Sequence, residues 1–301
     1  MKRAVIDIGT NSIRLLVADM EKGKITSGQK HVRMVRLGEM VDHSRVIGEN
    51  AFERCMEALD EFVKIALDEG ANDIKALATS AVRDAGNRDE IIRRIEAALP
   101  LEVDMLSGDE EAEMGYFGVL SSFDAKGVFM MVDIGGGSTE FVVGNKKEIF
   151  YKKSLDMGAV RMTEKFIKSD PVDPGESSEL ESHVRKIIKS ELGDVPPFEK
   201  GIAVGIGGTI TTLGAIKLKM ENYDRGKIHL ASIGLVEISE MISVFGKAKL
   251  NSRRNITGLD SERADIIYAG SIILQEIMQF FGCKEIIVSD YDNLEGYLMT
   301  R

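Results

Sequence analysis

Acidic and hydroxyl side chains flank a run of three glycines near the middle of the chain. The segment Met131–Gly144 reads MVDIGGGSTEFVVG, with Asp133 before Gly135–Gly137 and Glu140 shortly after them. A glycine turn between two apolar runs predicts a β-hairpin whose tip presents backbone N–H groups to an anion. Carboxylates beside bound phosphates commonly hold Mg²⁺. The pattern therefore favours a phosphate and metal site, and a glycine-rich hairpin with incidental polar residues is the alternative.

A second copy of this pattern lies near the start of the chain. Asp7–Ala18 reads DIGTNSIRLLVA and aligns without a gap with Asp133–Gly144, DIGGGSTEFVVG, 126 positions later. Two strand–turn–strand phosphate loops in one chain predict a duplicated domain. The expected phosphate-binding residues are Thr10, Asn11 and Ser12 in the first copy, and Gly136, Gly137, Ser138 and Thr139 in the second.

An acidic cluster opens a predicted helix over Ser107–Ser122. Ser107 and Glu110 have the spacing of a capping box, and acidic side chains suit the positive end of a helix. These two effects explain most of the cluster. Because Glu110 would fold back on Ser107, Glu111 is left to point elsewhere, and it becomes a candidate general base.

A glycine pair follows the predicted strand Ile202–Ile206. Gly207, Gly208 and Thr209 stand between that strand and a helix expected from about Ile210. A turn of this kind places N–H groups and the helix dipole at one spot, which suits a phosphate. The segment is neither a P-loop nor a dinucleotide fingerprint, because the lysine of the first and the third glycine of the second are missing. A close-packed turn without a ligand is the alternative.

The elements that must position these residues follow from the spacing of apolar side chains. The first hairpin is expected over Arg3–Ile8 and Ile13–Asp19, with a third strand over Lys24–Arg36. Further predicted elements are a helix over Ala51–Glu69, a strand over Ile74–Ala78, a helix capped by Asn87 and ending near Ala98, a strand over Glu102–Leu106, a helix capped by Asp173, a buried helix over Leu259–Phe281 capped by Asp260, a strand over Lys284–Ser289 and a closing helix over Tyr291–Thr300.

Composition and charge narrow the function classes. The chain has 301 residues, enough for two domains, and its 44% hydrophobic and 29% charged residues are typical of a globular protein. A net charge of −10 argues against a general nucleic-acid binder. The cysteines and histidines lack disulfide or metal-ligand spacing, and we expect neither a signal peptide nor a membrane span. We therefore expect a cytoplasmic protein without a nucleic-acid or membrane partner, divided into domains over residues 1–122 and 123–301, with the last helix, 291–301, free to pack back on the first domain.

Seven segments together resemble one family. They are ATSAVRDAGN (Ala78–Asn87), SGDEEAEMGYFG (Ser107–Gly118), DIGGGSTEFVVG (Asp133–Gly144), DMGAVRMTEKF (Asp156–Phe166), GIGGTITTL (Gly205–Leu213), RADIIYAGSIIL (Arg263–Leu274) and IIVSDYDNLEGYL (Ile286–Leu298). Over nearly its whole length the chain resembles the exopolyphosphatase/guanosine pentaphosphate phosphatase (Ppx/GppA) family, in its short two-domain form. The duplicated hairpins also resemble those of the actin/Hsp70/sugar-kinase superfamily. The resemblance implies an α/β fold with two ribonuclease-H-like domains flanking a cleft.

The resemblance also implies an activity and its residues. It implies Mg²⁺- or Mn²⁺-dependent hydrolysis of the terminal phosphoanhydride of inorganic polyphosphate, with pppGpp as the alternative substrate. The family's general base falls on Glu111, in agreement with the capping argument. The family's metal-binding or water-positioning residues fall on Asp133 and Glu140, and the arginine of its Ala-Thr-Ser motif falls on Arg83, which would donate to a phosphate. We expect Asp7 to help to hold the metal. A kinase-like phosphotransferase and a non-catalytic polyphosphate or nucleotide sensor are the alternatives on this fold, and we expect a homodimer.

Overall fold

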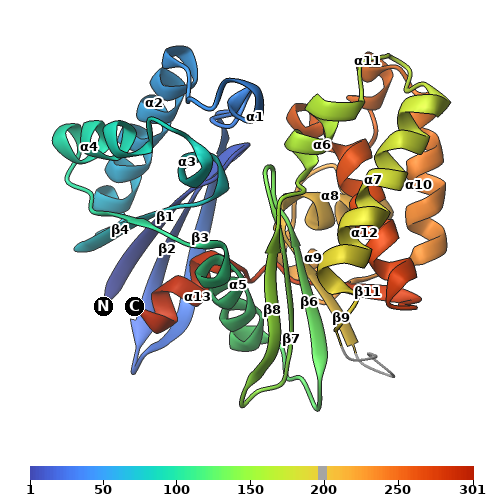
Figure 1. The fold of residues 1–301 in the computed structure, drawn as a ribbon. Coiled ribbons are helices and arrows are strands. Elements are labelled where there is room, and N and C mark those ends of the chain that lie inside the picture. The colour runs from blue at the N-terminus through green and yellow to red at the C-terminus, as the bar shows by residue number, and fades with distance from the viewer. Residues whose placement is uncertain (196–201) are drawn as a thin grey trace. The chain divides into compact units, whose positions relative to one another are not determined.

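The protein is divided into two compact units. The structure, a computed structural model, describes residues 1–195 and 202–301. Unit 1 consists of Met1–Ser121 together with Asp292–Arg301, and unit 2 consists of Ser122–Tyr291 (Figure 1). The C-terminal helix thus belongs to the same unit as the N-terminal strands, although it follows all of unit 2 in the sequence. In the described part of the chain, no helix is long and apolar enough to cross a membrane.

Unit 1 is built on a sheet of five strands in the order β3-β2-β1-β4-β5. The first three strands form an antiparallel meander, and β4 and β5 add in parallel beside β1. The bounds are β1 Lys2–Ile8, β2 Ser12–Glu21, β3 Lys24–Met34, β4 Asp73–Ala78 and β5 Val103–Met105.

Helices cover both faces of this sheet (Figure 1). Apolar side chains such as Ile6 pack against α2 and α4, whereas Val5 and Leu16 pack against α5 and α13. Neighbouring side chains of a strand point to opposite faces, so Asp7 and Arg14 lie on the face covered by α5 and α13. The helices of unit 1 are α1 Val41–Ser44, α2 Glu49–Asp68, α3 Ser80–Asp84, α4 Arg88–Ala98, α5 Gly108–Ser122 and α13 Asn293–Thr300.

Unit 2 is built on a sheet of six strands in the order β10-β11-β9-β6-β7-β8. The bounds are β6 Phe129–Ile134, β7 Thr139–Gly144, β8 Ile149–Leu155, β9 Ile202–Ile206, β10 Ser232–Gly234 and β11 Glu285–Val288. One face of the sheet packs against helices, among which α12 is buried along most of its length. The helices are α6 Ala159–Phe166, α7 Pro174–Leu192, α8 Gly207–Lys217, α9 Arg225–Ile228, α10 Leu235–Lys247, α11 Leu250–Arg253, the 3₁₀ turn η1 Ser261–Arg263 and α12 Ile267–Phe280.

The two sheets share one strand order. Strands β3-β2-β1-β4-β5 of unit 1 correspond in order and direction to β8-β7-β6-β9-β11 of unit 2, and β10 is an addition at the edge of unit 2. The predicted fold class, an α/β fold of two domains, is therefore confirmed, and both sheets are mixed. The shared order also supports the duplication that the sequence repeat predicts.

Three local predictions differ in part from the structure. Asn87 is the N-cap residue of α4, which ends at Ala98 as predicted, but its side chain binds the backbone N–H and carbonyl of Ile47 instead of capping the helix. The helix expected over Leu259–Phe281 is interrupted: Asp260 caps the short turn η1, and α12 begins only at Ile267. Helix α8 begins at Gly207, before the expected start. A contact distant in sequence explains the side chain of Asn87, and a break within the apolar run explains the late start of α12.

Candidate functional site

The glycine turns of the two copies close with the same hydrogen bond. The N–H of Gly9 donates to Ser12 O over 3.1 Å, and the N–H of Gly135 donates to Ser138 O over 3.0 Å. A Cβ added to these glycines would lie only 2.8 Å and 3.2 Å from the same two carbonyl oxygens. Glycine is therefore suited to both turns by close backbone approach, and the repeated sequence folds into repeated loop geometry.

Helix α6 holds the turn of unit 2 from behind. The N–H of Val160 donates to Gly136 O over 2.9 Å, and Arg161 Nε donates to Gly137 O over 2.7 Å. Gly158 lies so close that a Cβ there would overlap the backbone of Gly136. The turn carbonyls are thus bound on the α6 side, which fixes the conformation of the turn.

The two hydroxyl residues after this turn are buried. Thr139 has no exposed surface, and its Oγ1 donates to Met157 O over 2.5 Å. Ser138 is 2% exposed. The hydroxyl of Thr139 therefore binds the turn to the segment before α6. We still expect the backbone N–H groups of the turn to bind phosphate.

A row of polar side chains crosses three strands of unit 2. Asp133 on β6 lies directly opposite Glu140 on β7, which lies directly opposite Ser154 on β8. Ser154 Oγ donates to Glu140 Oε1 over 2.7 Å. Directly opposed residues share a face of the sheet. Asp133 and Glu140 therefore lie together on the face away from the main helical core, and both are buried.

Two carboxylates on one face fit the way proteins hold Mg²⁺, which usually keeps several waters and takes one or two carboxylates plus phosphate oxygens. Within residues 1–195 and 202–301, no group of three or more His, Cys, Asp or Glu side chains is placed to hold a metal ion. Asp133 and Glu140 therefore suit Mg²⁺ as a partial site that substrate phosphates would complete, and this assignment stays a prediction.

The glycine pair of unit 2 lies against two charged side chains. Gly207 has a φ of +84°, which favours glycine, and a Cβ there would overlap Asp133 Oδ1. A Cβ on Gly208 would overlap the guanidinium of Arg263. Thr209 follows and is buried. The first turn of α8 thus packs against one acid and one arginine, and Arg263 is a residue that sequence reasoning missed, although it opens the RADIIYAG motif.

The turn of unit 1 is backed by the chain that follows β3. The N–H groups of Val35 and Arg36 donate to Asn11 O over 3.1 and 2.9 Å, and the N–H of Gly38 donates to Thr10 O over 2.8 Å. Thr10 and Asn11 are buried. This turn is therefore held through its carbonyls in the same way as its counterpart in unit 2.

Arg14 takes the place in the first copy that Glu140 takes in the second. Asp7 lies directly opposite Arg14, as Asp133 lies opposite Glu140. Arg14 Nε donates to Asp7 Oδ2 over 3.0 Å, whereas Asp7 Oδ1 is buried without a hydrogen-bond partner. Burial raises the pKa of Asp7, and Arg14 opposes that rise. Sequence reasoning missed Arg14, although the alignment of the two copies already contained the substitution.

Glu111 lies at the start of α5 and is released by the predicted capping box. Ser107 N–H donates to Glu110 Oε2 over 2.9 Å, and Glu110 N–H donates to Ser107 Oγ over 3.2 Å. Glu111 is buried, and Arg83 Nη1 donates to its Oε2 over 2.9 Å and to Leu106 O over 3.1 Å. Glu110 is thus used as a cap, and Glu111 faces Arg83 instead.

The surroundings of Glu111 shift its pKa upward from the ordinary value. Burial raises the pKa of this carboxyl, Arg83 opposes the rise, and the nearby charge of Asp7 adds to it. A buried carboxyl with a raised pKa and one fixed hydrogen bond has the properties of a general base that titrates closer to neutrality.

Comparison with known proteins relates the chain to several curated sequences. It is 40% identical to the bifunctional 3-dehydroquinate synthase/phosphatase of Fusobacterium nucleatum over 99% of this chain, and it spans 46% of the length of that protein. It is 33% identical to Exopolyphosphatase 2 of Mycobacterium tuberculosis, with 99% of this chain and 97% of that protein covered.

Solved structures are also similar. A Ppx/GppA family member from Aquifex aeolicus matches with a TM-score of 0.83 at 31% identity, covering 100% of this chain and 97% of its own. An exopolyphosphatase from Cytophaga hutchinsonii matches with a TM-score of 0.90 at 26% identity, covering 100% and 97%. The model of the Ppx/GppA phosphatase family matches residues 16–301. The repeated loops, the buried carboxylates and these matches agree, and the chain belongs to the Ppx/GppA phosphatase family.

Proposed function

We propose that this chain releases orthophosphate from the end of inorganic polyphosphate in a Mg²⁺-dependent hydrolysis. Water would attack the terminal phosphorus, the phosphoanhydride P–O bond would break, and the shortened polyphosphate would leave. Glu111 would accept the proton of the attacking water. Such a reaction needs a positioned nucleophile and neutralised phosphate charge, but little covalent chemistry from the protein.

The observation that carries the proposal is the setting of Glu111. Its neighbour Glu110 is bound in the capping box, so Glu111 alone of the pair is buried and bound to Arg83. The raised pKa makes Glu111 a stronger base than an ordinary glutamate, which suits proton abstraction from water. Arg83 would orient this carboxylate, and its planar donors suit a phosphate oxygen as well.

The loops and the carboxylate row of unit 2 would supply phosphate-binding and metal-binding groups. Asp133 and Glu140 would hold Mg²⁺, which when bound would neutralise part of the phosphate charge. The backbone around Gly136 and Gly137, and the first turn of α8, would donate N–H groups to phosphate oxygens.

The names of the relatives support polyphosphate as the proposed substrate. Proteins named as exopolyphosphatases match nearly the whole chain, whereas pppGpp offers the same terminal phosphoanhydride and is the comparison substrate. Phosphate release should be measured from long polyphosphate, tripolyphosphate and pppGpp side by side, with and without Mg²⁺. We expect the fastest release from polyphosphate, and only with Mg²⁺. Faster release from pppGpp would show that pppGpp is the preferred substrate. Full activity in excess chelator would show that the reaction needs no divalent metal.

The role of Glu111 is tested by replacing each glutamate of the pair. Glu111→Gln keeps the shape and removes the proton acceptor, so kcat should fall by about 10²–10⁴-fold with KM largely unchanged. The matched control is Glu110→Gln, which should lower Tm through the cap and leave kcat near that of the wild type. An exchange of these two phenotypes would show that the base has been assigned to the wrong residue.

We also expect a homodimer, as the family resemblance implies. Light scattering on the purified protein would check this, and a monomer at all concentrations would contradict it.

A further inference from the structure

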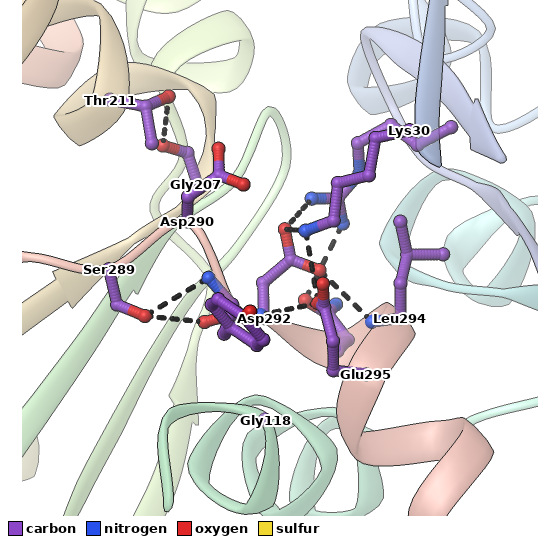
Figure 2. A network of polar contacts seen from close by, with 12 residues as sticks. Lys30, Gly118, Gly207, Thr211, Ser289, Asp290, Asp292, Leu294 and Glu295 are labelled. Carbon is purple, nitrogen blue, oxygen red and sulfur yellow. Dashed lines mark hydrogen bonds and ion pairs between the residues drawn. The ribbon is translucent and has the colours of Figure 1, made fainter. Parts of the chain in front are cut away.

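A cluster of buried charges fixes the C-terminal helix α13 in unit 1. We call it the cap cluster, and its members are Asp7, Arg14, Lys30, Asp292 and Glu295. Lys30 Nζ lies 3.1 Å from Asp292 Oδ2 and 3.0 Å from Glu295 Oε2 (Figure 2). The cluster thus joins strands from the beginning of the chain to the first turn of its last helix.

Asp292 and Glu295 form the cap of α13 as well. Asp292 Oδ1 accepts the N–H of Leu294 over 3.0 Å, and the N–H of Asp292 donates to Glu295 Oε2 over 3.0 Å (Figure 2). This is a capping box, which fixes the direction of both carboxylates. Asp292 can therefore act as a rigid partner for a side chain on the sheet.

Arg14 connects that cap to Asp7. Its Nη1 donates to Asp292 Oδ2 over 2.7 Å, and its Nε donates to Asp7 Oδ2 over 3.0 Å. Burial would raise the pKa of Asp292, but Arg14 and Lys30 outweigh it and lower the pKa to about 2. Asp292 is therefore ionised at neutral pH, and the planar guanidinium is fixed between two carboxylates.

Asp7 is bound by this arrangement through only one of its oxygens. Arg14 occupies Oδ2, while Oδ1 is buried without a hydrogen-bond partner, and the residue is 3% exposed. A buried oxygen without a partner is uncommon and requires an explanation. Asp7 immediately precedes the end of β1 and the turn Gly9–Ser12, so a ligand at that turn would supply the missing contact.

Close backbone contact keeps α13 from shifting. A Cβ on Gly118 of α5 would overlap the carbonyl of Asp292, and a Cβ on Gly296 would overlap the carbonyl of Met114. Helix α5 also carries Glu111 at its start. The cap of α13 is therefore seated against the helix of the proposed base and against the strand that carries Asp7.

We infer that Arg14 is a positioning residue, which holds the Asp7 carboxylate so that Oδ1 meets a Mg²⁺–polyphosphate complex, and that Asp292 sets the orientation of Arg14 from the cap of α13. The inference rests on the proposed function and assigns part of the site's construction to the last helix of the chain. Residues that orient a ligand in this way typically contribute about 10–100-fold to metal affinity or activity.

The test compares two single substitutions in the same helical turn. Asp292→Asn keeps a good N-cap residue but removes the charge that faces Arg14. Glu295→Gln is the matched control, because it removes the charge beside Lys30 and keeps a side-chain oxygen that can accept the N–H of Asp292. We expect Asp292→Asn to lower kcat on polyphosphate about 10-fold or more and to weaken Mg²⁺ binding, measured by calorimetry without substrate, to a similar degree. Glu295→Gln should lower Tm and leave both values near those of the wild type.

A double-mutant cycle shows whether Asp292 acts through Arg14. Once Arg14→Gln is present, adding Asp292→Asn should change kcat and Mg²⁺ affinity very little, since the connection is already broken. Unchanged kcat and Mg²⁺ affinity in Asp292→Asn, with only a lower Tm, would overturn the inference while leaving the proposed function intact. If the wild type does not hydrolyse polyphosphate, the proposed function is wrong. Calorimetry would then still test the inference. Equal Mg²⁺ affinities of the wild type and Asp292→Asn, or no Mg²⁺ binding by either, would overturn it.

Discussion

Three buried carboxylates in unit 1 have their proton affinities set by different neighbours. Burial raises the pKa of Asp7 and of Glu111, with Arg14 and Arg83 opposing the respective rise. Burial acts on Asp292 too, but two cations outweigh it and lower the pKa to about 2. Burial alone therefore does not decide the direction of a pKa shift here, because neighbouring cations and hydrogen bonds outweigh it at Asp292 and do not at Asp7 or Glu111. Glu111, with its raised pKa, suits proton transfer, and Asp292, with its lowered pKa, suits a fixed ion pair.

The raised pKa of Glu111 predicts the acid limb of the rate profile. The base must be ionised to accept a proton, so kcat should fall as the pH drops through a value above the ordinary 4.5 of a glutamate. Arg83→Gln removes the cation that opposes this rise, so the midpoint of the limb should move to higher pH. The measurement is kcat on polyphosphate against pH for both proteins. A midpoint that moves down in Arg83→Gln would contradict the arrangement.

The carboxylate row of unit 2 predicts a change in metal requirement. Asp133→Asn keeps the shape and removes one charge from the pair with Glu140, so more Mg²⁺ should be needed for half-maximal activity, and kcat should remain below that of the wild type at saturation. Ser154→Ala is the comparison variant, because it removes only the hydrogen bond to Glu140. A smaller Mg²⁺ requirement in Asp133→Asn would exclude this residue as a ligand.

At the scale of elements, helix α5 combines two constraints. Its first turn presents Glu111, and its middle receives the backbone of Asp292 against Gly118. The hydrogen-bonded cap at the start of α5 and the glycine in its middle therefore both fix the position of this helix within unit 1.

The close approach at Gly118 predicts a large stability effect. A Cβ in Gly118→Ala would overlap the carbonyl of Asp292, and backbone moves less readily than a side chain. Overpacking typically costs about 1–3 kcal/mol, and we expect the upper part of that range or more from denaturant unfolding. Gly127→Ala is the control, because a Cβ there meets nothing within 4 Å. Equal stability of the two variants would show that α5 and α13 adjust freely.

Much of the site could be predicted from local pattern, and the parts that could not depend on distant residues. The Ser107–Glu110 cap and the two glycine turns are decided within a few residues, so their spacing predicts them. The contact of Arg14 with Asp292 joins residues 278 positions apart, and no local pattern announces it. Asn87 was misread for the same reason, since its partner Ile47 lies 40 positions away. The sequence repeat predicted the similar strand order of the two units, because matching segments indicate a duplicated domain.

At the scale of the whole molecule, unit 1 is discontinuous. Its sheet face around Val5 and Leu16 is covered by Leu294, Tyr297 and Leu298 of α13. These residues follow unit 2 in the sequence, so unit 1 is completed by a segment that comes after all of unit 2. The last ten positions therefore contribute to the core of the first unit.

Removal of residues 292–301 should uncover that face. We expect the amides of β1 and β2 to lose protection in hydrogen exchange measured by mass spectrometry, because their apolar cover and the cap-cluster carboxylates are gone. The strands β6 and β7 of unit 2 serve as the internal reference and should change much less. Removal of Arg301 alone, which pairs with Glu110 at the surface, is the matched control. Unchanged protection of β1 and β2 in the longer truncation would contradict the proposed dependence.

The discontinuity has a consequence for the nascent chain. Ribosomes add about 5–20 residues per second, so unit 2 takes roughly ten seconds or more to emerge after the first strands of unit 1 are made. Throughout that time the face of β1 and β2 that α13 will cover has no partner helix from the C-terminus, although both strands are already synthesised. Synthesis of unit 1 thus begins before that of unit 2 and is completed after it. Until α13 is made, the apolar side chains around Val5 and Leu16 have only the unit 1 residues that precede unit 2, such as Met114 of α5, to cover them.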